Sequence, residues 1–249
     1  MDLHINYWGD FVEKLKVYLC YSTTILCIFL FGALLYAAFD GSSEQQVQTV
    51  ASKPSSIVII DAGHGGEDSG AVDNGLLEKD VNLDIALKLR DFLTASGYTV
   101  VMIRDTDVSI YDSSSSTISE KKVSDLHNRL SIINSSADNI LISIHQNKFE
   151  QSKYYGAQMF YSPNNSESQY LAESIRQSVT GLLQPENKRE LKAADQTIYI
   201  LNNATVPAVI VECGFLSNPD EAQKLSTEEY RSKMAFAIYC GFLDYQKSK

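Results

Sequence analysis

The sequence predicts a single α/β domain with a mostly parallel twisted sheet flanked by helices, preceded by one N-terminal transmembrane helix. Two patterns lead to this fold class. From residue 57 onward, short β-branched runs such as 57–60 (IVII) alternate with longer stretches of helical periodicity. That alternation is typical of parallel strands joined by helices. Near the N-terminus, the 23 residues 17–39 carry no charge, and a helix of that length can cross a bilayer core of about 30 Å.

The uncharged run favours an uncleaved membrane anchor over a cleaved signal peptide, because Tyr36-Ala37-Ala38 is a poor cleavage site. Lys14 and Lys16 precede the run, and the next basic residue is Lys53, so the positive-inside rule places the N-terminus in the cytoplasm. We therefore expect a single-pass protein of the cell membrane with its folded domain on the extracytoplasmic side. The expected segments are a cytoplasmic N-terminus at 1–16, an anchor at 17–39, a flexible Ser/Gln-rich linker at 40–56 and a folded domain at 57–245.

Each element of the folded domain has its own signal. The helix at 79–96 has Val81, Ile85 and Leu89 on one stripe and ends at Gly97. The helix at 124–135 begins with a Ser cap, and the helix at 167–183 ends before Pro185. Apolar runs predict strands at 57–62, 98–104, 139–145, 156–161, 198–201 and 207–213, and two further helices are expected at 219–224 and 228–245. The serine-rich segment 107–122 has no periodicity and is expected to be a mobile loop.

Composition and missing motifs exclude several functions. The net charge of −10 argues against a nucleic-acid partner. Two of the four cysteines lie in the anchor, and Cys213 and Cys240 are expected to be buried hydrophobic residues, so no disulfide framework is expected. The sequence has no G-x-S-x-G elbow, no phosphate-binding loop, no C-x-x-C and no H-E-x-x-H. A calcium-like start at Asp105 lacks the glycine and glutamate that such loops need.

Polar residues gather where the predicted strands end. His64, Arg104, His145 and Glu212 each lie at the carboxyl end of a strand, and Glu78 stands before the first long helix. Ligands of parallel α/β sheets bind at that edge. Two histidines and a glutamate suit a single zinc ion with an open position for water. We assign His64, Glu78 and His145 to the metal and Glu212 to acid/base catalysis.

Alternatives remain for some of these residues. Glu78 is the weakest assignment, because the helix dipole alone favours a glutamate there. The rival carboxylates are Glu67, Asp68 and Asp73. Arg104 either binds a substrate carboxylate or pairs with Asp61 or Asp105, and we favour the structural role. His4 and His127 are expected to lie outside the site.

Four motifs resemble, in order, those of the zinc-dependent N-acetylmuramoyl-L-alanine amidases over residues 57–245. They are DAGHGG from residue 61, LEKDVNL from 77, SIHQN from 143 and PAVIVECGFLSN from 207. The resemblance implies hydrolysis of the amide between N-acetylmuramic acid and L-alanine in peptidoglycan. It implies that His64, Glu78 and His145 bind zinc and that Glu212 is catalytic. Two departures are Ala62 in place of a proline and Gln146-Asn147-Lys148 in place of Asn-Ala after the histidine.

The layout is most similar to the membrane-anchored, CwlD-like branch that acts on spore cortex. This resemblance implies removal of peptide stems for muramic δ-lactam formation during sporulation. Segment 162–197 leaves little room for an inhibitory insertion, so we expect control by an activating protein partner or by a poorly formed metal-free site. The serine-rich loop and 148–155 are candidate contact surfaces. The alternatives are a zinc peptidase acting within the stem peptide and an inactive wall-binding protein.

Overall fold

The computed structural model describes residues 3–40 and 56–248. Residues 41–55, which form almost all of the expected linker, lie outside the described residues. The chain divides into two units, and the first contains the single helix α1 (Leu3–Asp40). Within α1, Phe11–Gly32 is long and apolar enough to cross a membrane, and this stretch overlaps the expected anchor at 17–39. Its described side chains are exposed, as expected for a helix without a protein core around it.

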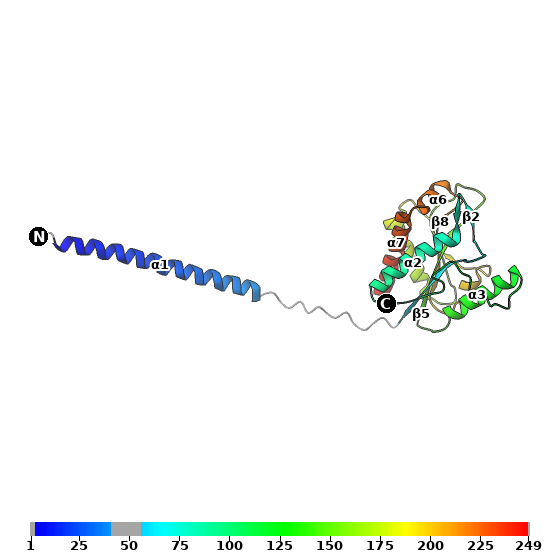
Figure 1. Ribbon diagram of the computed structural model, residues 1–249, viewed down its shortest axis with the longest axis horizontal. Coiled ribbons are helices and arrows are strands. Elements are labelled where there is room, and N and C mark those ends of the chain that lie inside the picture. The colour runs from blue at the N-terminus through cyan, green and yellow to red at the C-terminus, as the bar shows by residue number, and fades with distance from the viewer. Residues whose placement is uncertain (1–2, 41–55, 249) are drawn as a thin grey trace. The chain divides into compact units, whose positions relative to one another are not determined.

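The second unit is built on a six-stranded sheet with the order β4-β1-β5-β8-β6-β7. Figure 1 shows helices α2 and α7 on one side of this sheet and α3 on the other. Its strands are β1 (Ile57–Ala62), β4 (Thr99–Met102), β5 (Asn139–Asn147), β6 (Gln158–Tyr161), β7 (Lys192–Ala193) and β8 (Ala208–Phe215). The four strands β4, β1, β5 and β8 are parallel, whereas β6 pairs antiparallel with β8. A separate hairpin joins β2 (Val72–Asp73) to β3 (Leu76–Leu77). The prediction of a mostly parallel sheet is confirmed.

Helices cover both faces of the sheet. One face packs against α2 (Glu78–Ala95), α4 (Glu167–Leu182) and α7 (Glu228–Lys247), with residues such as Val58, Ile142 and Ile238 in the core between them. The other face packs against α3 (Ile118–Ile133) and the short α5 (Tyr199–Asn203), around Ile59 and Leu141. A further helix, α6 (Pro219–Leu225), follows β8. Since side chains alternate along a strand, His145 on β5 and Glu212 on β8 share the α3/α5 face with Leu141 and Ile210.

Two predictions about individual elements are wrong, and three short strands were not predicted. Residues 198–201 begin α5 instead of forming a strand, because Ile200 and Leu201 reach the core from a single helical turn. Helix α3 begins at Ile118, not near residue 124, so the last part of the expected serine-rich loop is helical. A capping box between Thr117 and Glu120 fixes that start. The strands of the β2–β3 hairpin and β7 have two residues each, too short for a periodic signal.

Candidate metal centre

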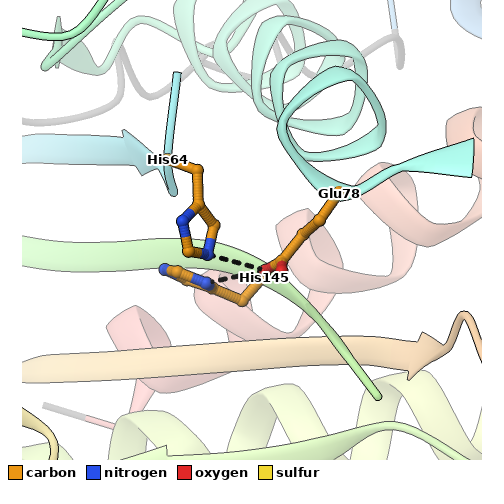
Figure 2. A group of neighbouring side chains, drawn as sticks. All are labelled: His64, Glu78 and His145. Carbon is orange, nitrogen blue, oxygen red and sulfur yellow. Dashed lines mark hydrogen bonds and ion pairs between the residues drawn. The ribbon is translucent and has the colours of Figure 1, made fainter. Parts of the chain in front are cut away.

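Three side chains from separate elements converge at the carboxyl edge of the sheet (Figure 2). His64 follows β1, Glu78 begins α2 and His145 lies near the end of β5. Glu78 Oε1 lies 3.2 Å from His64 Nε2 and 2.9 Å from His145 Nδ1. One ligand atom from each residue lies within 4.8 Å of the others. Two ring nitrogens and one carboxylate oxygen therefore face a common point and could hold a metal ion.

Glu78 is held firmly in this position. Its carboxylate accepts hydrogen bonds from the backbone N–H of Ala71 at 2.7 Å, of Gln146 at 3.1 Å and from the Asn82 amide at 3.3 Å. Burial opposes its ionisation, but the hydrogen bonds and charges of His145 and His64 outweigh burial and lower the pKa of Glu78. The carboxylate is therefore ionised and oriented, as a metal ligand must be.

His64 has its own carboxylate partner. Asp68 Oδ2 lies 2.9 Å from Nδ1 of His64, on the side of the ring away from Glu78. Burial opposes protonation of the ring, but the hydrogen bonds to Asp68 and Glu78 prevail and raise the pKa of His64 to about 9. A carboxylate on one ring nitrogen commonly orients a metal-binding histidine through the other. This contact supports Nε2 as the nitrogen available for a metal.

Two glycines make room for these side chains. A Cβ at Gly63 would lie 2.2 Å from Nε2 of His145, and a Cβ at Gly70 would lie 2.6 Å from both Glu78 Oε2 and the His64 ring. No real Cβ atom approaches other atoms that closely. His64 itself has a φ of 62°, a conformation that non-glycine residues rarely adopt. The glycine-rich turn after β1 is thus shaped around the three side chains.

A buried ion pair secures the strained turn. Arg129 of α3 donates hydrogen bonds to Asp61 Oδ1, to the Ala62 carbonyl and, at 2.8 Å, to the carbonyl of His64. Ser143 donates to the other oxygen of Asp61 at 2.7 Å. Burial alone would raise the pKa of Asp61, but the Arg129 charge lowers it. The Arg129–Asp61 pair therefore connects α3, β1 and β5 next to the backbone of His64.

Glu212 lies beside this group on β8, in register with His145 of β5. Its Oε2 atom is buried and has no hydrogen-bond partner among the described residues. Burial is the main reason that the pKa of Glu212 rises to about 7. A carboxylate with such a pKa can take up and release a proton near neutral pH.

The structure assigns the other candidate residues to different contacts. Arg104 is buried and donates hydrogen bonds to the carbonyls of Ala62, Thr106, Gly63 and Lys79. This is the structural role that we favoured. Its hydrogen-bond partners, however, are backbone carbonyls and not the expected carboxylate. Among the rival carboxylates, Glu67 pairs with Lys121 and Asp73 with Lys148. His127 lies against the ring of Tyr199.

Sequence reasoning missed several residues that support the site. Asp68 was weighed only as a rival ligand, although its four-residue spacing from His64 in a glycine-rich turn suits a side-chain hydrogen bond. Asn82 is one helical turn after Glu78, a spacing that brings side chains together. Arg129 had no sequence signal, since a basic residue in an amphipathic helix is ordinarily exposed.

A cavity of about 330 Å³ adjoins the two histidines on the α3/α5 face. His64, His145 and Gly63 form one wall. Tyr111 from the loop before α3, Leu126 from α3 and Ile200 from α5 also line the cavity, together with several charged side chains of α3. Two of the three converging ligands, His64 and His145, therefore face a space that part of a substrate can enter.

Comparison with known proteins agrees with these features. The family model described as N-acetylmuramoyl-L-alanine amidase (Amidase_3) matches residues 58–244. The chain is 39% identical over 193 residues to the germination-specific N-acetylmuramoyl-L-alanine amidase of Bacillus subtilis, covering 78% of this chain and 81% of the relative. It superposes with a TM-score of 0.75 and 42% identity on the CwlD amidase from Clostridioides difficile, solved in complex with the GerS lipoprotein, covering 78% of this chain and all of that one.

More distant amidases share the fold. The amidase AmiC2 of Nostoc punctiforme superposes with a TM-score of 0.66 at 29% identity, covering 77% of this chain and 97% of that one. The match to the family model spans nearly the whole sheet and both layers of helices, from β1 to α7. The chain is therefore an enzyme of the N-acetylmuramoyl-L-alanine amidase family, similar to the CwlD-like amidases.

Proposed function

We propose that this amidase is zinc-dependent, with His64, Glu78 and His145 as the metal ligands and Glu212 as the catalytic acid/base. The observation that carries the proposal is the convergence of three ligand atoms, each within 4.8 Å of the others, beside a carboxylate with an unpartnered buried oxygen. Three protein ligands with an open fourth position are typical of catalytic zinc sites, whereas structural sites have four.

The residues fit zinc better than other common ions. Two imidazole nitrogens favour zinc over magnesium or calcium, which prefer oxygen ligands. The clashes that a Cβ at Gly63 or Gly70 would cause indicate a turn built around these ligands. The Asp68–His64 hydrogen bond adds the outer support that zinc-binding histidines ordinarily have. The donor set and its surroundings thus support a single zinc ion.

The proposed reaction follows from the side chains around this point. When bound, zinc supplies Lewis acidity that polarises the scissile carbonyl and makes water nucleophilic near neutral pH. Glu212 accepts the proton from the attacking water and delivers it to the nitrogen of the departing L-alanine. In the metal-free protein, burial raises the pKa of Glu212 to about 7, and a side chain withdrawn from water in this way is suited to gain a proton and then lose it.

We further propose that α1 anchors the enzyme and that the amidase domain acts on the extracytoplasmic side. The length and composition of Phe11–Gly32 and the lysines that precede residues 17–39 support this orientation. By analogy with the germination-specific relative, the domain would remove peptide stems for muramic δ-lactam formation in spore cortex. The CwlD amidase was solved with a lipoprotein, which supports an activating protein partner for this chain as well.

Mass spectrometry of digested peptidoglycan tests the reaction. The full-length chain in detergent, loaded with zinc, should release intact stem peptides that begin with L-alanine and leave free lactoyl groups on muramic acid. A zinc peptidase would instead leave L-alanine attached to muramic acid, and an inactive wall-binding protein would release neither product. Adding a chelator should abolish release, and zinc should restore it. Assays with and without a candidate partner would show whether the partner is needed.

A further inference from the structure

An exposed aromatic surface lies at the ends of the strands that carry His145 and Glu212, and neither the ligands nor Glu212 account for it. We call it the aromatic platform and define it as Phe149, Tyr154 and Tyr155, with Phe215 beneath them. Phe149 is 50% exposed, Tyr154 36% and Tyr155 54%, whereas Phe215 is buried. Large aromatic side chains gathered on a surface commonly mark a binding site.

The platform is continuous with the catalytic edge. Phe149 comes four residues after His145, and Phe215 comes three residues after Glu212. Leu216, which follows Phe215, donates its N–H to the carbonyl of Asn147 at 2.8 Å, so the carboxyl ends of β5 and β8 lie side by side. A polymer bound along the carboxyl edge of the sheet can therefore contact both the metal centre and this surface.

The platform is held in one arrangement. The Phe149 and Tyr154 rings meet edge to face with centroids 4.9 Å apart, and the Arg189 guanidinium lies 4.6 Å from the centroid of Phe215. The backbone is also secured. Phe149 N–H donates to Ser217 at 3.0 Å, and Arg189 Nε donates to the Tyr155 carbonyl at 2.7 Å. Because these contacts already fix the side chains, little conformational entropy is lost when a ligand binds, and this favours affinity.

Cations lie among the rings. The Lys153 ammonium stands 5.5 Å from the centroid of Tyr154, and the guanidinium of Arg189 lies over the ring of Phe215. The whole chain has a net charge of −10, so basic groups at this edge are suited to an anionic ligand. Aromatic faces and phenol hydroxyls match a sugar polymer, because each pyranose ring has an apolar face and a polar rim. The cations suit the carboxylates that the stem peptides of the same polymer carry.

The chemistry of the two surfaces assigns the two halves of the substrate. The scissile amide joins a glycan strand to a stem peptide, which carries charged groups. The cavity of about 330 Å³ on the α3/α5 face is lined by both basic and acidic side chains, among them Lys122 and Asp125, which suit the charged groups of a stem peptide. The aromatic platform is open. We propose that the platform binds the glycan strand of peptidoglycan by stacking sugar rings on Tyr155 and Phe149; this rests on the proposed function.

Binding of short glycan strands stripped of their stem peptides tests the proposal without turnover. Tyr155→Ala and Phe149→Ala in the full-length chain should each weaken this binding by about tenfold, the loss of one ring contact. Tyr155→Phe should restore it, because the ring remains. Tyr170→Ala is the matched control, since Tyr170 is a 64% exposed tyrosine on α4, and it should bind glycan like the wild type. Thermal unfolding of each variant checks the fold.

Kinetics separates this proposal from the proposed function. On peptidoglycan, the platform variants should raise KM with little change in kcat, and on a single muramoyl dipeptide they should match the wild type. Unchanged glycan affinity and KM in Tyr155→Ala and Phe149→Ala would overturn the proposal, and loss of partner-protein binding alone would assign the surface to a protein instead. If the wild type releases no stem peptides but the variants still lose glycan affinity, the proposed chemistry fails and the platform stands.

Discussion

Asp68 Oδ2 lies 2.9 Å from Nδ1 of His64, while Nε2 of the same ring faces Glu78 at 3.2 Å. Once the ring loses a proton to bind a metal, this carboxylate favours the tautomer with the proton on Nδ1, which leaves Nε2 free for the metal. Because Gly65 and Asp68 also exchange backbone hydrogen bonds of 3.0 Å, the orientation of the ring is tied to the conformation of the turn.

Removing this contact should weaken zinc binding without removing a ligand. We expect Asp68→Ala to lower zinc affinity about 10- to 100-fold, the usual effect of losing such a partner. The zinc affinity of Asp68→Asn should lie between those of the wild type and Asp68→Ala, because the amide keeps a hydrogen-bonding oxygen. Competition with a chromophoric chelator measures the affinity. Zinc affinity equal to that of the wild type in Asp68→Ala would show that the turn alone orients His64.

Glu212→Gln should separate catalysis from metal binding. The amide keeps the size of the side chain but cannot accept a proton, so we expect kcat to fall by about 10²- to 10⁴-fold. Zinc affinity should stay near that of the wild type, because Glu212 is not one of the three converging residues. His145→Ala is the contrasting variant and should lose zinc affinity itself. Full activity of Glu212→Gln would exclude Glu212 as the acid/base.

The raised pKa of Glu212 predicts how stability depends on pH in the metal-free protein. The pKa is 4.5 for an ordinary glutamate and about 7 here, chiefly because the side chain is buried. The folded state therefore binds a proton more tightly than the unfolded state. Neutral Glu212 contributes its full stability below pH 4.5, and this contribution is lost as the pH rises through 7.

The measurement compares the wild type with Glu212→Gln in chelator across this pH range. The two proteins should have similar stability near pH 4, and at pH 8 the variant should be more stable by up to about 3 kcal/mol. Denaturant unfolding gives both free energies. If the free energies of unfolding of the two proteins differ by the same amount from pH 4 to pH 8, Glu212 has an ordinary pKa in the folded protein.

The sequence predicted the strands and helices that have long periodic patterns. β1 was predicted with its observed bounds, and α2 and α7 within two residues at each end. These elements bury a whole face or stripe, which is visible as a hydrophobic pattern. α5 was mistaken for a strand because Ile198, Ile200 and Leu201 alternate too briefly to distinguish one helical turn from a short strand.

The start of α3 was missed although its signal is in the sequence. Thr117 and Glu120 have the spacing of a capping box, and both of its hydrogen bonds are present. The preceding serines hid this pattern, since a serine run by itself indicates a loop. The segment before the helix is also secured: Asp107 accepts from the N–H of Gly66 at 2.8 Å, and the Ser109 hydroxyl donates to the Gly65 carbonyl.

Topology accounts for how far the candidate site could be predicted. Parallel strands end on one edge, so residues at the ends of β1, β5 and β8 had to lie near one another. Contacts that depend on side-chain direction could not be derived this way. The reach of Arg129 from α3 to the His64 carbonyl depends on the packing of α3 against β1, which no local pattern contains.

Gly63→Ala tests whether the turn after β1 is shaped around the metal ligands. The added methyl would lie 2.2 Å from Nε2 of His145, so the ring or the turn must move. We expect zinc affinity to fall at least about tenfold, because one ligand is displaced. Gly181→Ala on α4 is the matched control, since its added methyl meets no atom within 4 Å.

The control variant should bind zinc like the wild type and gain up to about 1 kcal/mol of stability, because alanine favours a helix over glycine. Zinc titration and thermal unfolding of both variants give the comparison. If Gly63→Ala keeps the zinc affinity of the wild type, His145 can move away from Gly63 without leaving the metal, and the glycine serves only the turn. If it loses affinity while its unfolding temperature stays near that of the wild type, the missing side chain at residue 63 is a requirement of the metal site itself.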